Sequence, residues 1–530
     1  MTETQATDAT EPTRTEPTQT KQTPAEPTQT EPTPAEPTQT EVLRSLDPVT
    51  GAVVGEWPVD NADTVRAAVE QARIAAEGWR ELGFAGRKKA LLRWNSRLVA
   101  DADEFTALIH RENGKPLEDA YLELLLALEH IDWAARNAEK ALAPEKVAPG
   151  MFMANHEAVI ERPPLGVVGV IGPWNYPVYT PNGSIAYALA AGNAVVFKPS
   201  EYTPAIGHYY ADAFAAANPE LPPGVLTVVN GYGATGAALV ESGVDKIAFT
   251  GSTPTGKKIM AAAAATLTPV LLECGGKDAF IIADDADIPA AADAVAWSAM
   301  ANSGQTCVGT ERVYVDERVY QQFLAELQNK LQGIEPGSDE RASYGPMTMP
   351  AQLDIVRSHI EDALAQGGRA VVGGPDSVRA PFIGPVVLVD TPESSRAVQE
   401  ETFGPTVTVR SVAGIDEAVE LANGTEFGLA STVFSRQHGM AIARRLRAGA
   451  TSINAPLSFA AISALPFGGV GASGIGRIHG ADGLREFTRT HSIARQRFVI
   501  PGMALLSFSR KSSTVAMIKQ IVRLRHGRHA

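Results

Sequence analysis

Residues 167–198 read VVGVIGPWNYPVYTPNGSIAYALAAGNAVVFK, and they decide the fold. An apolar run over 167–172 ends at a glycine, a helical pattern follows over 184–191, and a second apolar run covers 194–198. Prolines, glycines and asparagines interrupt the stretch, so it does not have the unbroken apolar length of a membrane span. The pattern predicts a strand, a helix and a second strand in a buried, mostly parallel sheet.

The same alternation continues on both sides of this stretch. Further helices are predicted over 63–79, 86–113 and 204–217, with strands at 225–229 and 246–250. A second set of strands is predicted at 279–282, 312–315, 407–409 and 431–434. Strands that alternate with helices are typical of a parallel sheet covered on both faces. We therefore predict an α/β fold with two lobes that meet near residue 272, and a cleft at their junction is a favoured ligand site.

Composition limits the class of protein and of partner. The chain has 530 residues, of which 44% are hydrophobic and 20% charged, and its net charge is -14. This balance is typical of a globular protein with more than one domain and argues against a nucleic-acid partner. Its two cysteines form no disulfide framework, and the first residues have no secretory pattern. We expect a cytoplasmic protein.

The two ends differ from the rest. Residues 1–41 repeat Thr, Glu, Pro and Gln with almost no large apolar side chains, which predicts a disordered tail. Residues 503–530 carry six Lys and Arg residues and no acid, with apolar residues on one helical face. Such a basic amphipathic tail can make peripheral contact with an anionic membrane, dock on its own subunit or stay disordered.

Three residue types point to covalent chemistry on a carbonyl group. Cys307 follows the small polar run 302–306, and its thiolate would be a nucleophile. Glu273 lies 34 positions earlier in the run LECGGK, where two glycines leave room for a substrate, and it could act as a base. Asn175, between Trp174 and Tyr176, has an amide that could bind an oxyanion. Cys274, at the end of an apolar strand, is interpreted as a packing residue.

The strings PWN, LECGGK and GQTC, in this order and at this spacing, resemble the NAD(P)-dependent aldehyde dehydrogenase superfamily from roughly residue 42 to 500. The resemblance implies a variant Rossmann cofactor lobe plus an α/β catalytic lobe, with a bridging β oligomerisation arm. It implies an NAD-binding domain at 42–272 with arm strands near 150–167, a catalytic domain at 273–487 and a final arm segment at 488–502. A homodimer or homotetramer is expected because exposed arm strands favour pairing.

The resemblance also assigns roles to single residues. Cys307 is the nucleophile, Glu273 activates the hydrolytic water, and the Asn175 amide binds the oxyanion. The NAD-binding residues, with NADP possible, are Ile171, Gly172, Pro173, Trp174, Lys198, Ser200, Glu201, Gly231, Gly251, Ser252, Glu401 and Phe403. Gly231 opens a literal GxGxxG string at 231–236, but family members do not use that loop as the usual dinucleotide fingerprint. Glu201 favours NAD because its carboxylate would repel a 2′-phosphate. No metal is expected.

Three segments, 174–183, 297–310 and 454–467, correspond to the substrate funnel of the family and contain no charged residue. Their substrate-contacting residues are expected to be Tyr176, Tyr179, Thr306, Phe459 and Phe467. A buried carboxylate on the substrate would need a cation, so an uncharged apolar or aromatic aldehyde is expected. The alternatives are a relative that transfers the acyl group to coenzyme A and a membrane-peripheral protein that has lost activity.

Overall fold

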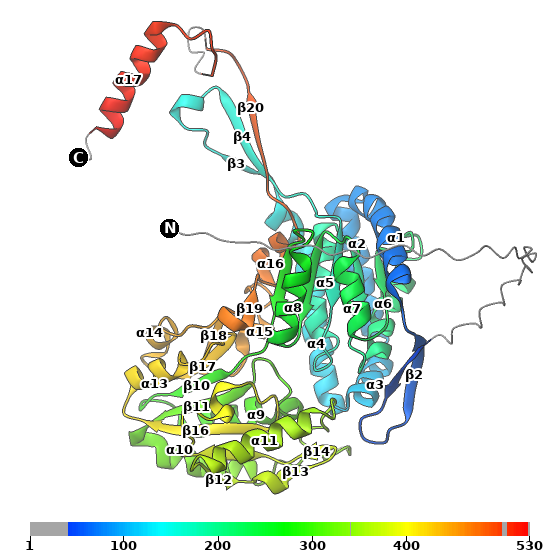
Figure 1. The fold of residues 1–530 in the computed structure, drawn as a ribbon, viewed down its shortest axis with the longest axis vertical. Helices are drawn as coiled ribbons and strands as arrows, with labels where there is room; N and C mark the ends of the chain where they lie inside the picture. Colours follow the sequence, from blue (N-terminus) through cyan, green and yellow to red (C-terminus); the bar gives the residue numbers. More distant parts are fainter. Residues whose placement is uncertain (1–40, 340, 501–505, 528–530) are drawn as a thin grey trace, which may run out of the picture. The chain divides into compact units, whose positions relative to one another are not determined.

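The structure is a computed structural model that describes residues 41–339, 341–500 and 506–527. The tail predicted for residues 1–41 lies outside the described residues except for Glu41, as do the ends of the predicted C-terminal segment. Residues from Glu41 onward belong to one unit, which contains two large sheets (Figure 1).

The first sheet has six strands. They are β5 (Val167–Ile171), β6 (Ala194–Lys198), β7 (Leu226–Val228), β8 (Lys246–Thr250), β9 (Val270–Glu273) and β19 (Gly474–Ile475). Their order is β19-β9-β8-β5-β6-β7, and only β19 runs antiparallel to its neighbour. The chain runs from β5 outward to β7 and then returns to β8 beside β5. The carboxyl ends of β5 and β8 therefore form a topological switch point, where a ligand can enter between diverging loops.

Helices cover both faces of this sheet. One face packs on α1 (Ala62–Glu81), α7 (Gly233–Glu241) and α8 (Thr253–Ala263). The other packs on α5 (Tyr179–Ala191) and α6 (Pro204–Ala217), which are covered in turn by α2 (Gly83–Ala100), α3 (Ala102–Asn113), α4 (Leu117–Leu142) and α16 (Gly480–Glu486). Val168 and Val170 face the α5 side while Val167 faces the α1 side, as strand alternation requires. Because both faces are buried, the strands are mostly apolar, and the charged Lys198, Lys246 and Glu273 lie at strand ends.

The second sheet has seven strands. They are β10 (Asp278–Ile282), β11 (Thr310–Asp316), β12 (Arg369–Val372), β15 (Val386–Val389), β16 (Thr406–Val412), β17 (Ala430–Phe434) and β18 (Ala450–Ile453). Their order is β12-β15-β16-β11-β10-β17-β18, with β12 alone antiparallel. One face packs on α9 (Ile288–Met300) and α10 (Glu317–Leu331), and the other on α13 (Ile415–Ala422) and α14 (Gly439–Ala443). The short helices α12 (Arg396–Gln399) and α15 (Ser458–Ala461) and the longer α11 (Gln352–Ala365) lie in the connections.

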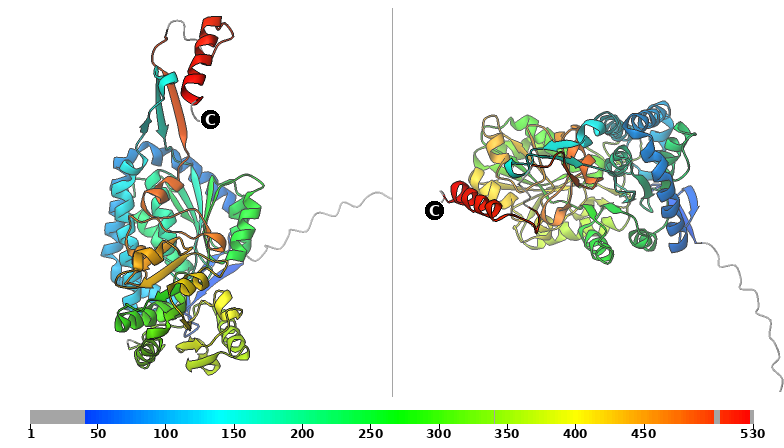
Figure 2. Two further views of the ribbon diagram at one scale, coloured as in Figure 1. Left: turned by 90° about the vertical axis from the view of Figure 1, so that its left-hand side faces the viewer. Right: turned by 90° about the horizontal axis from the view of Figure 1, so that it is seen from above.

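Smaller elements complete the described residues. A three-stranded sheet has the order β20-β4-β3, with β3 (Glu145–Val147), β4 (His156–Glu161) and β20 (His491–Gln496), so β3 and β20 are its edges (Figure 2). Two hairpins join β1 (Val42–Leu46) to β2 (Val53–Pro58) and β13 (Val378–Arg379) to β14 (Phe382–Ile383). Helix α17 (Ser512–His526) contains Lys519, Arg523 and Arg525 of the basic C-terminal segment. Among the described helices, none is long and apolar enough to cross a membrane.

The predicted α/β class is confirmed, and most predicted elements are found at the expected places. One predicted helix was wrong: the pattern over 86–113 belongs to two helices, because the chain turns at Asp101 between α2 and α3. Asp101 has φ −99° and ψ 14°, outside the helical range. Its backbone N–H donates to the Arg97 carbonyl and ends α2. The apolar period runs on through the turn, so it does not reveal the break.

Candidate active site

The loop before Cys307 has an unusual backbone. After α9, three consecutive residues, Asn302, Ser303 and Gly304, have positive φ values of 51°, 60° and 68°. Such a conformation costs roughly 1–3 kcal/mol for each non-glycine residue, so the surroundings must enforce it. Ser303 Oγ donates to the Gly345 carbonyl at 2.6 Å, and Gln305 Nε2 donates to the Asn302 carbonyl at 2.9 Å. The loop is held by buried hydrogen bonds rather than by local preference.

The turn after β5 is bonded to this loop. Asn175 Nδ2 donates to the Gln305 carbonyl at 2.9 Å, and the Asn175 carbonyl accepts from Asn302 Nδ2 at 3.0 Å. The Tyr176 hydroxyl lies 3.0 Å from Thr306 Oγ1. The structure therefore brings the predicted oxyanion donor next to the predicted nucleophile, from positions more than 130 residues apart in sequence.

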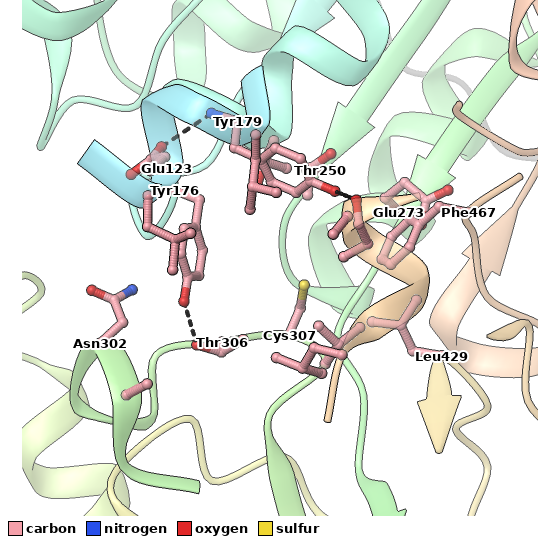
Figure 3. A pocket seen from close by; sticks show the side chains of 18 of the residues that line it. Glu123, Tyr176, Tyr179, Thr250, Glu273, Asn302, Thr306, Cys307, Leu429 and Phe467 are labelled. Carbon is pink, nitrogen blue, oxygen red and sulfur yellow. Dashed lines mark hydrogen bonds between the residues drawn. The ribbon is translucent and has the colours of Figure 1, made fainter. Parts of the chain in front are cut away.

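Both Cys307 and Glu273 line a single cavity of about 240 Å³. In Figure 3 the Cys307 sulfur points into the space framed by Tyr176, Phe467 and Leu429. Of the predicted substrate-contacting residues, Tyr176, Tyr179, Thr306 and Phe467 line the cavity. Phe459 is not among the lining residues and instead packs 6.0 Å from the Phe467 ring, between centroids. Asn175 is not among them either.

A fourth wall of the cavity was not predicted from the sequence. It comes from α4 and the residue two positions before it, through Lys115, Asp119, Leu122, Glu123 and Leu126. The amphipathic pattern of α4 predicts which face of the helix points inward. It does not predict whether that face packs in the core or lines a cavity. His479 also lines the cavity, and its ring packs against the His130 ring with centroids 3.8 Å apart and ring planes tilted by 41°.

Glu273 is buried without a hydrogen-bond partner. It ends β9 with 3% of its surface exposed, and neither carboxylate oxygen has a partner among the described residues. Burial raises the pKa of Glu273 well above its usual value, with a further contribution from Glu486, while Arg477 acts in the opposite direction. Burial therefore disfavours the charged carboxylate, which is the form that acts as a base.

The Cys307 thiol has a raised pKa for the same main reason. Burial is the largest cause, followed by the nearby carboxyl groups of Glu401, Asp278 and Glu273. A thiol in this state is mostly protonated at neutral pH, so its reaction requires loss of a proton to a neighbour or to solvent. Burial thus disfavours the charged forms of both groups that would do the chemistry.

The carboxyl ends of β5, β6 and β8 form the edge predicted to hold a dinucleotide. Lys198 is 4% exposed, and its Nζ donates only to the Pro199 carbonyl, at 3.1 Å, among the described residues. Burial lowers the pKa of Lys198, against the effect of Glu201. Ser200 Oγ donates to Glu201 at 3.4 Å. Lys198 and Glu201 are three residues apart at this edge, and their ammonium and carboxylate groups supply the donors and acceptors that ribose hydroxyl groups bind.

Helix α8 begins beside this edge. Its N-cap residue, Ser252, makes no side-chain cap bond, and its hydroxyl contacts Thr255 Oγ1 at 3.0 Å. The first turn contains no acid, so its free N–H groups and the Ser252 hydroxyl fit a phosphate. Gly251 N donates to the Glu273 carbonyl at 3.0 Å, which ties this site to the end of β9.

The remaining predicted residues of the first sheet lie at the end of β5 and in the turn between β7 and α7. Ile171, Gly172, Pro173 and Trp174 continue directly from β5, and a Cβ at Gly172 would lie only 2.9 Å from the Phe197 ring. Gly231 has φ 148° and lies between β7 and α7, where a side chain would collide with Thr235. The turn therefore requires glycine for packing and conformation.

The second sheet contributes Glu401 and Phe403 from the loop after α12. Gly276 N donates to Glu401 Oε1 at 3.0 Å, and burial with the nearby Glu311 raises the pKa of Glu401 to about 8. The Phe403 ring meets the Trp174 ring edge-on, with centroids 5.6 Å apart. Residues of both sheets therefore meet at the switch point. Among the residues that the structure describes, no group of three or more side chains could hold a metal ion.

Comparison with known proteins agrees with this geometry. The model of the aldehyde dehydrogenase family matches residues 35–493. The chain is 37% identical to 4,4'-diapolycopene aldehyde oxidase of Methylomonas sp, over 87% of each chain. It is 35% identical to a putative succinate-semialdehyde dehydrogenase [NADP(+)] of Mycolicibacterium smegmatis, over 84% of this chain and 87% of the relative.

Solved structures show the same relationship. Lactaldehyde dehydrogenase from Escherichia coli superposes with a TM-score of 0.82 at 31% identity, over 86% of this chain and 96% of its own. An NAD-dependent aldehyde dehydrogenase from Sinorhizobium meliloti gives a TM-score of 0.82 at 32% identity, over 87% and 92%. With a matching family model, relatives above 30% identity and a shared fold, the chain belongs to the aldehyde dehydrogenase family of oxidoreductases.

Proposed function

We propose that the protein oxidises an uncharged apolar or aromatic aldehyde to the carboxylic acid with NAD, through covalent intermediates on Cys307. The observation that carries this proposal is the single cavity that both Cys307 and Glu273 line. A nucleophile and a base that share one enclosed space can act in turn on the same carbon atom.

In the first half of the reaction, the Cys307 thiol gives its proton to a neighbouring base or to solvent, and its sulfur attacks the aldehyde carbon. A C–S bond forms, and the negative charge moves to the carbonyl oxygen of the thiohemiacetal. The Asn175 amide and the Cys307 backbone N–H stabilise this charge. NAD held at the sheet edge would supply the hydride acceptor, and the carbon on Cys307 would then be a thioester.

In the second half, Glu273 takes a proton from water as the water attacks the thioester carbon. The C–S bond breaks, the acid leaves, and the Cys307 thiolate is regenerated. Glu273 is buried, and burial disfavours its charged form, so this step needs water to reach the carboxyl group. The presence of Glu273 favours hydrolysis over transfer of the acyl group to coenzyme A, which is the rival reaction.

The residues at the sheet edge would hold the cofactor. The α8 N-terminus and Ser252 would bind the phosphates, and Lys198 with Glu201 would bind the adenosine ribose. Glu401 and Phe403 would hold the nicotinamide end. The Glu201 carboxylate favours NAD over NADP, because a 2′-phosphate beside it would be repelled. Relatives include proteins named as NADP-dependent and as NAD-dependent, so a ratio of kcat/KM values for the two cofactors tests this choice.

The charges around the cavity support an uncharged substrate. Its charged lining residues are Lys115, Asp119, Glu123 and Glu273. Lys115 is the only cation among the described lining residues, and it is already paired with Glu123. A substrate carboxylate would meet carboxyl groups and no free cation, which is a costly arrangement.

A substrate screen tests this proposal. Purified protein with NAD is assayed against benzaldehyde, hexanal, decanal and succinic semialdehyde. We expect kcat/KM for the best uncharged aldehyde to exceed that for succinic semialdehyde by at least about 100-fold, as an unpaired buried carboxylate implies. Preference for succinic semialdehyde would overturn the substrate assignment, and turnover that requires coenzyme A would favour the rival reaction.

We also propose that the protein is a cytoplasmic homodimer or homotetramer, assembled through the sheet of β3, β4 and β20. Both edges of that sheet can pair with a second copy. Light scattering at micromolar concentration tests this, and a monomer would contradict it. Peripheral contact with an anionic membrane is proposed for α17 and the residues before it, because Leu506 and Phe508 are exposed beside basic residues.

A further inference from the structure

A fully buried ion pair lies under the turn that carries Asn175. Lys115 Nζ is bonded to Glu123 Oε2, and neither side chain has any exposed surface. Lys115 follows α3 by two residues, and Glu123 lies in the second turn of α4. Removing two charges from water is costly, and such a pair seldom adds net stability. Stability therefore does not explain why the pair is buried here, and its contacts point to a role in the site.

Lys115 holds the first part of the turn. Its Nζ donates to the Asn175 carbonyl at 3.0 Å and lies 4.2 Å from the centre of the Tyr176 ring. The same carbonyl accepts from Asn302 Nδ2 at 3.0 Å, from the loop before Cys307. Two donors on one carbonyl oxygen fix the orientation of this peptide group, and with it the direction in which the Asn175 side chain leaves the backbone.

Glu123 holds the second part of the turn. Its Oε1 accepts from Val178 N at 2.8 Å and from Tyr179 N at 3.0 Å, as Figure 3 shows for Tyr179. Helix α5 begins at Tyr179, and its own N-cap residue makes no side-chain bond. The carboxylate from α4 therefore caps α5 in place of a local residue, and its charge suits the positive end of the helix.

We propose that Lys115 and Glu123 are positioning residues that fix the oxyanion-binding amide of Asn175 relative to Cys307. This inference rests on the proposed function. The Asn175 amide has two N–H donors; one bonds the Gln305 carbonyl, and the other can serve the oxyanion. A donor stabilises a transition state only where it is held in advance, and a displacement of about 1 Å can cost about 100-fold in rate.

The first test compares two buried carboxylates. Glu123→Gln removes the charge under the turn, whereas Glu112→Gln makes the same change at a carboxylate that caps α6 through Ala205 N and Ile206 N, both at 2.8 Å. The measured quantity is the rate of the NADH burst at saturating NAD and aldehyde, per site counted by thiol alkylation. We expect Glu123→Gln to slow the burst by about 10- to 100-fold and Glu112→Gln by less than about threefold. Equal effects of the two variants would overturn the proposal.

The second test asks whether the pair acts through Asn175. Glu123→Gln is combined with Asn175→Ala, and the burst rates of the four proteins form a cycle. A positioning role predicts that Glu123→Gln costs less than about threefold once Asn175 is absent. If Glu123→Gln slows the burst equally with and without Asn175, the positioning role is overturned, while the proposed function still stands. If Asn175→Ala does not slow the burst, the oxyanion assignment in the proposed function fails, and this inference fails with it.

A double variant covers the case in which Glu123→Gln does not fold, since it leaves the Lys115 charge unpaired. Lys115→Met with Glu123→Gln removes both charges, and the buried region then contains no uncompensated ion. This double variant should fold. Its NADH burst should be slower by about 10- to 100-fold, and the alkylation rate of Cys307 should be unchanged. A burst at the original rate would overturn the proposal.

Discussion

The two cysteines of the chain differ in backbone and surroundings, although both lie close to the candidate site. Cys274 directly follows β9, is 4% exposed, and bonds through its backbone N–H to the Ser473 carbonyl at 3.0 Å. Its sulfur packs against Gly256, where a Cβ would lie 2.8 Å away. Cys307 instead follows the left-handed turn of residues 302–304, although both cysteines line the cavity.

Acidity does not separate the two thiols in the free protein. Burial is the main cause in both cases, and it raises the pKa of Cys274 to about 11 and raises that of Cys307 as well. Both cysteines line the cavity, so the difference lies in the backbone before Cys307 and in the bond from the Asn175 amide to the same loop. We infer that the backbone of the loop, more than the chemistry of the residue itself, makes Cys307 the candidate nucleophile.

The largest expected difference comes from removing each thiol. Cys307→Ala should abolish formation of NADH, because no covalent intermediate can form. Cys274→Ala should retain kcat within about threefold and lose about 1 kcal/mol of the free energy of unfolding, as a small packing change does. Initial rates and denaturant unfolding of both variants check this. Similar losses of activity in the two variants would contradict the assignment of Cys307, and not Cys274, as the nucleophile.

The next largest effect is expected at Glu273, which precedes Cys274 and shares the cavity with Cys307. Glu273→Gln should lower steady-state turnover by about 10²- to 10⁴-fold, the usual cost of losing a general base. Its matched control is Glu112→Gln, which also replaces a buried glutamate but lies outside the cavity lining. Turnover of Glu273→Gln close to the original value would contradict the assignment.

The pH dependence of Cys307 alkylation should change rates by about 100-fold. Burial and three nearby carboxyl groups raise the thiol pKa, so the thiolate is a minor species that increases with pH. In Cys274→Ala protein without cofactor, the rate constant with iodoacetamide should rise about tenfold per pH unit from about pH 7 to 9. A plateau below about pH 8 would mean that the thiol is already ionised.

The smallest effect is expected from the C-terminal helix. Deletion of residues 503–530 should leave kcat/KM for a water-soluble aldehyde within about twofold, because the described part of this segment, 506–527, contributes no residue to the cavity lining. It should abolish any salt-sensitive binding to vesicles that contain anionic lipid. Absence of vesicle binding by the intact protein at low salt would exclude a membrane role for this helix.

The sequence predicts the sheets better than the loops that join them. The strands at 194–198 and 246–250 occur as predicted, because each is an apolar run with a clear boundary. The positive φ values of Asn302 and Ser303 depend on bonds to distant residues, so no local pattern reveals them. Lys115 and Glu123 resemble surface charges in the sequence, and only tertiary packing shows that they form a buried pair.

The central claim is that Cys307 carries an acyl group that Glu273 helps to hydrolyse, and pre-steady-state kinetics of Glu273→Gln test it most directly. The variant is mixed with saturating NAD and aldehyde, and NADH is followed while quenched samples are weighed by intact-protein mass spectrometry. The account predicts a burst of up to about one NADH per site, then a stall, with the acyl mass on the peptide that contains Cys307. Continuous turnover without a burst, or a burst without acylated Cys307, would contradict it.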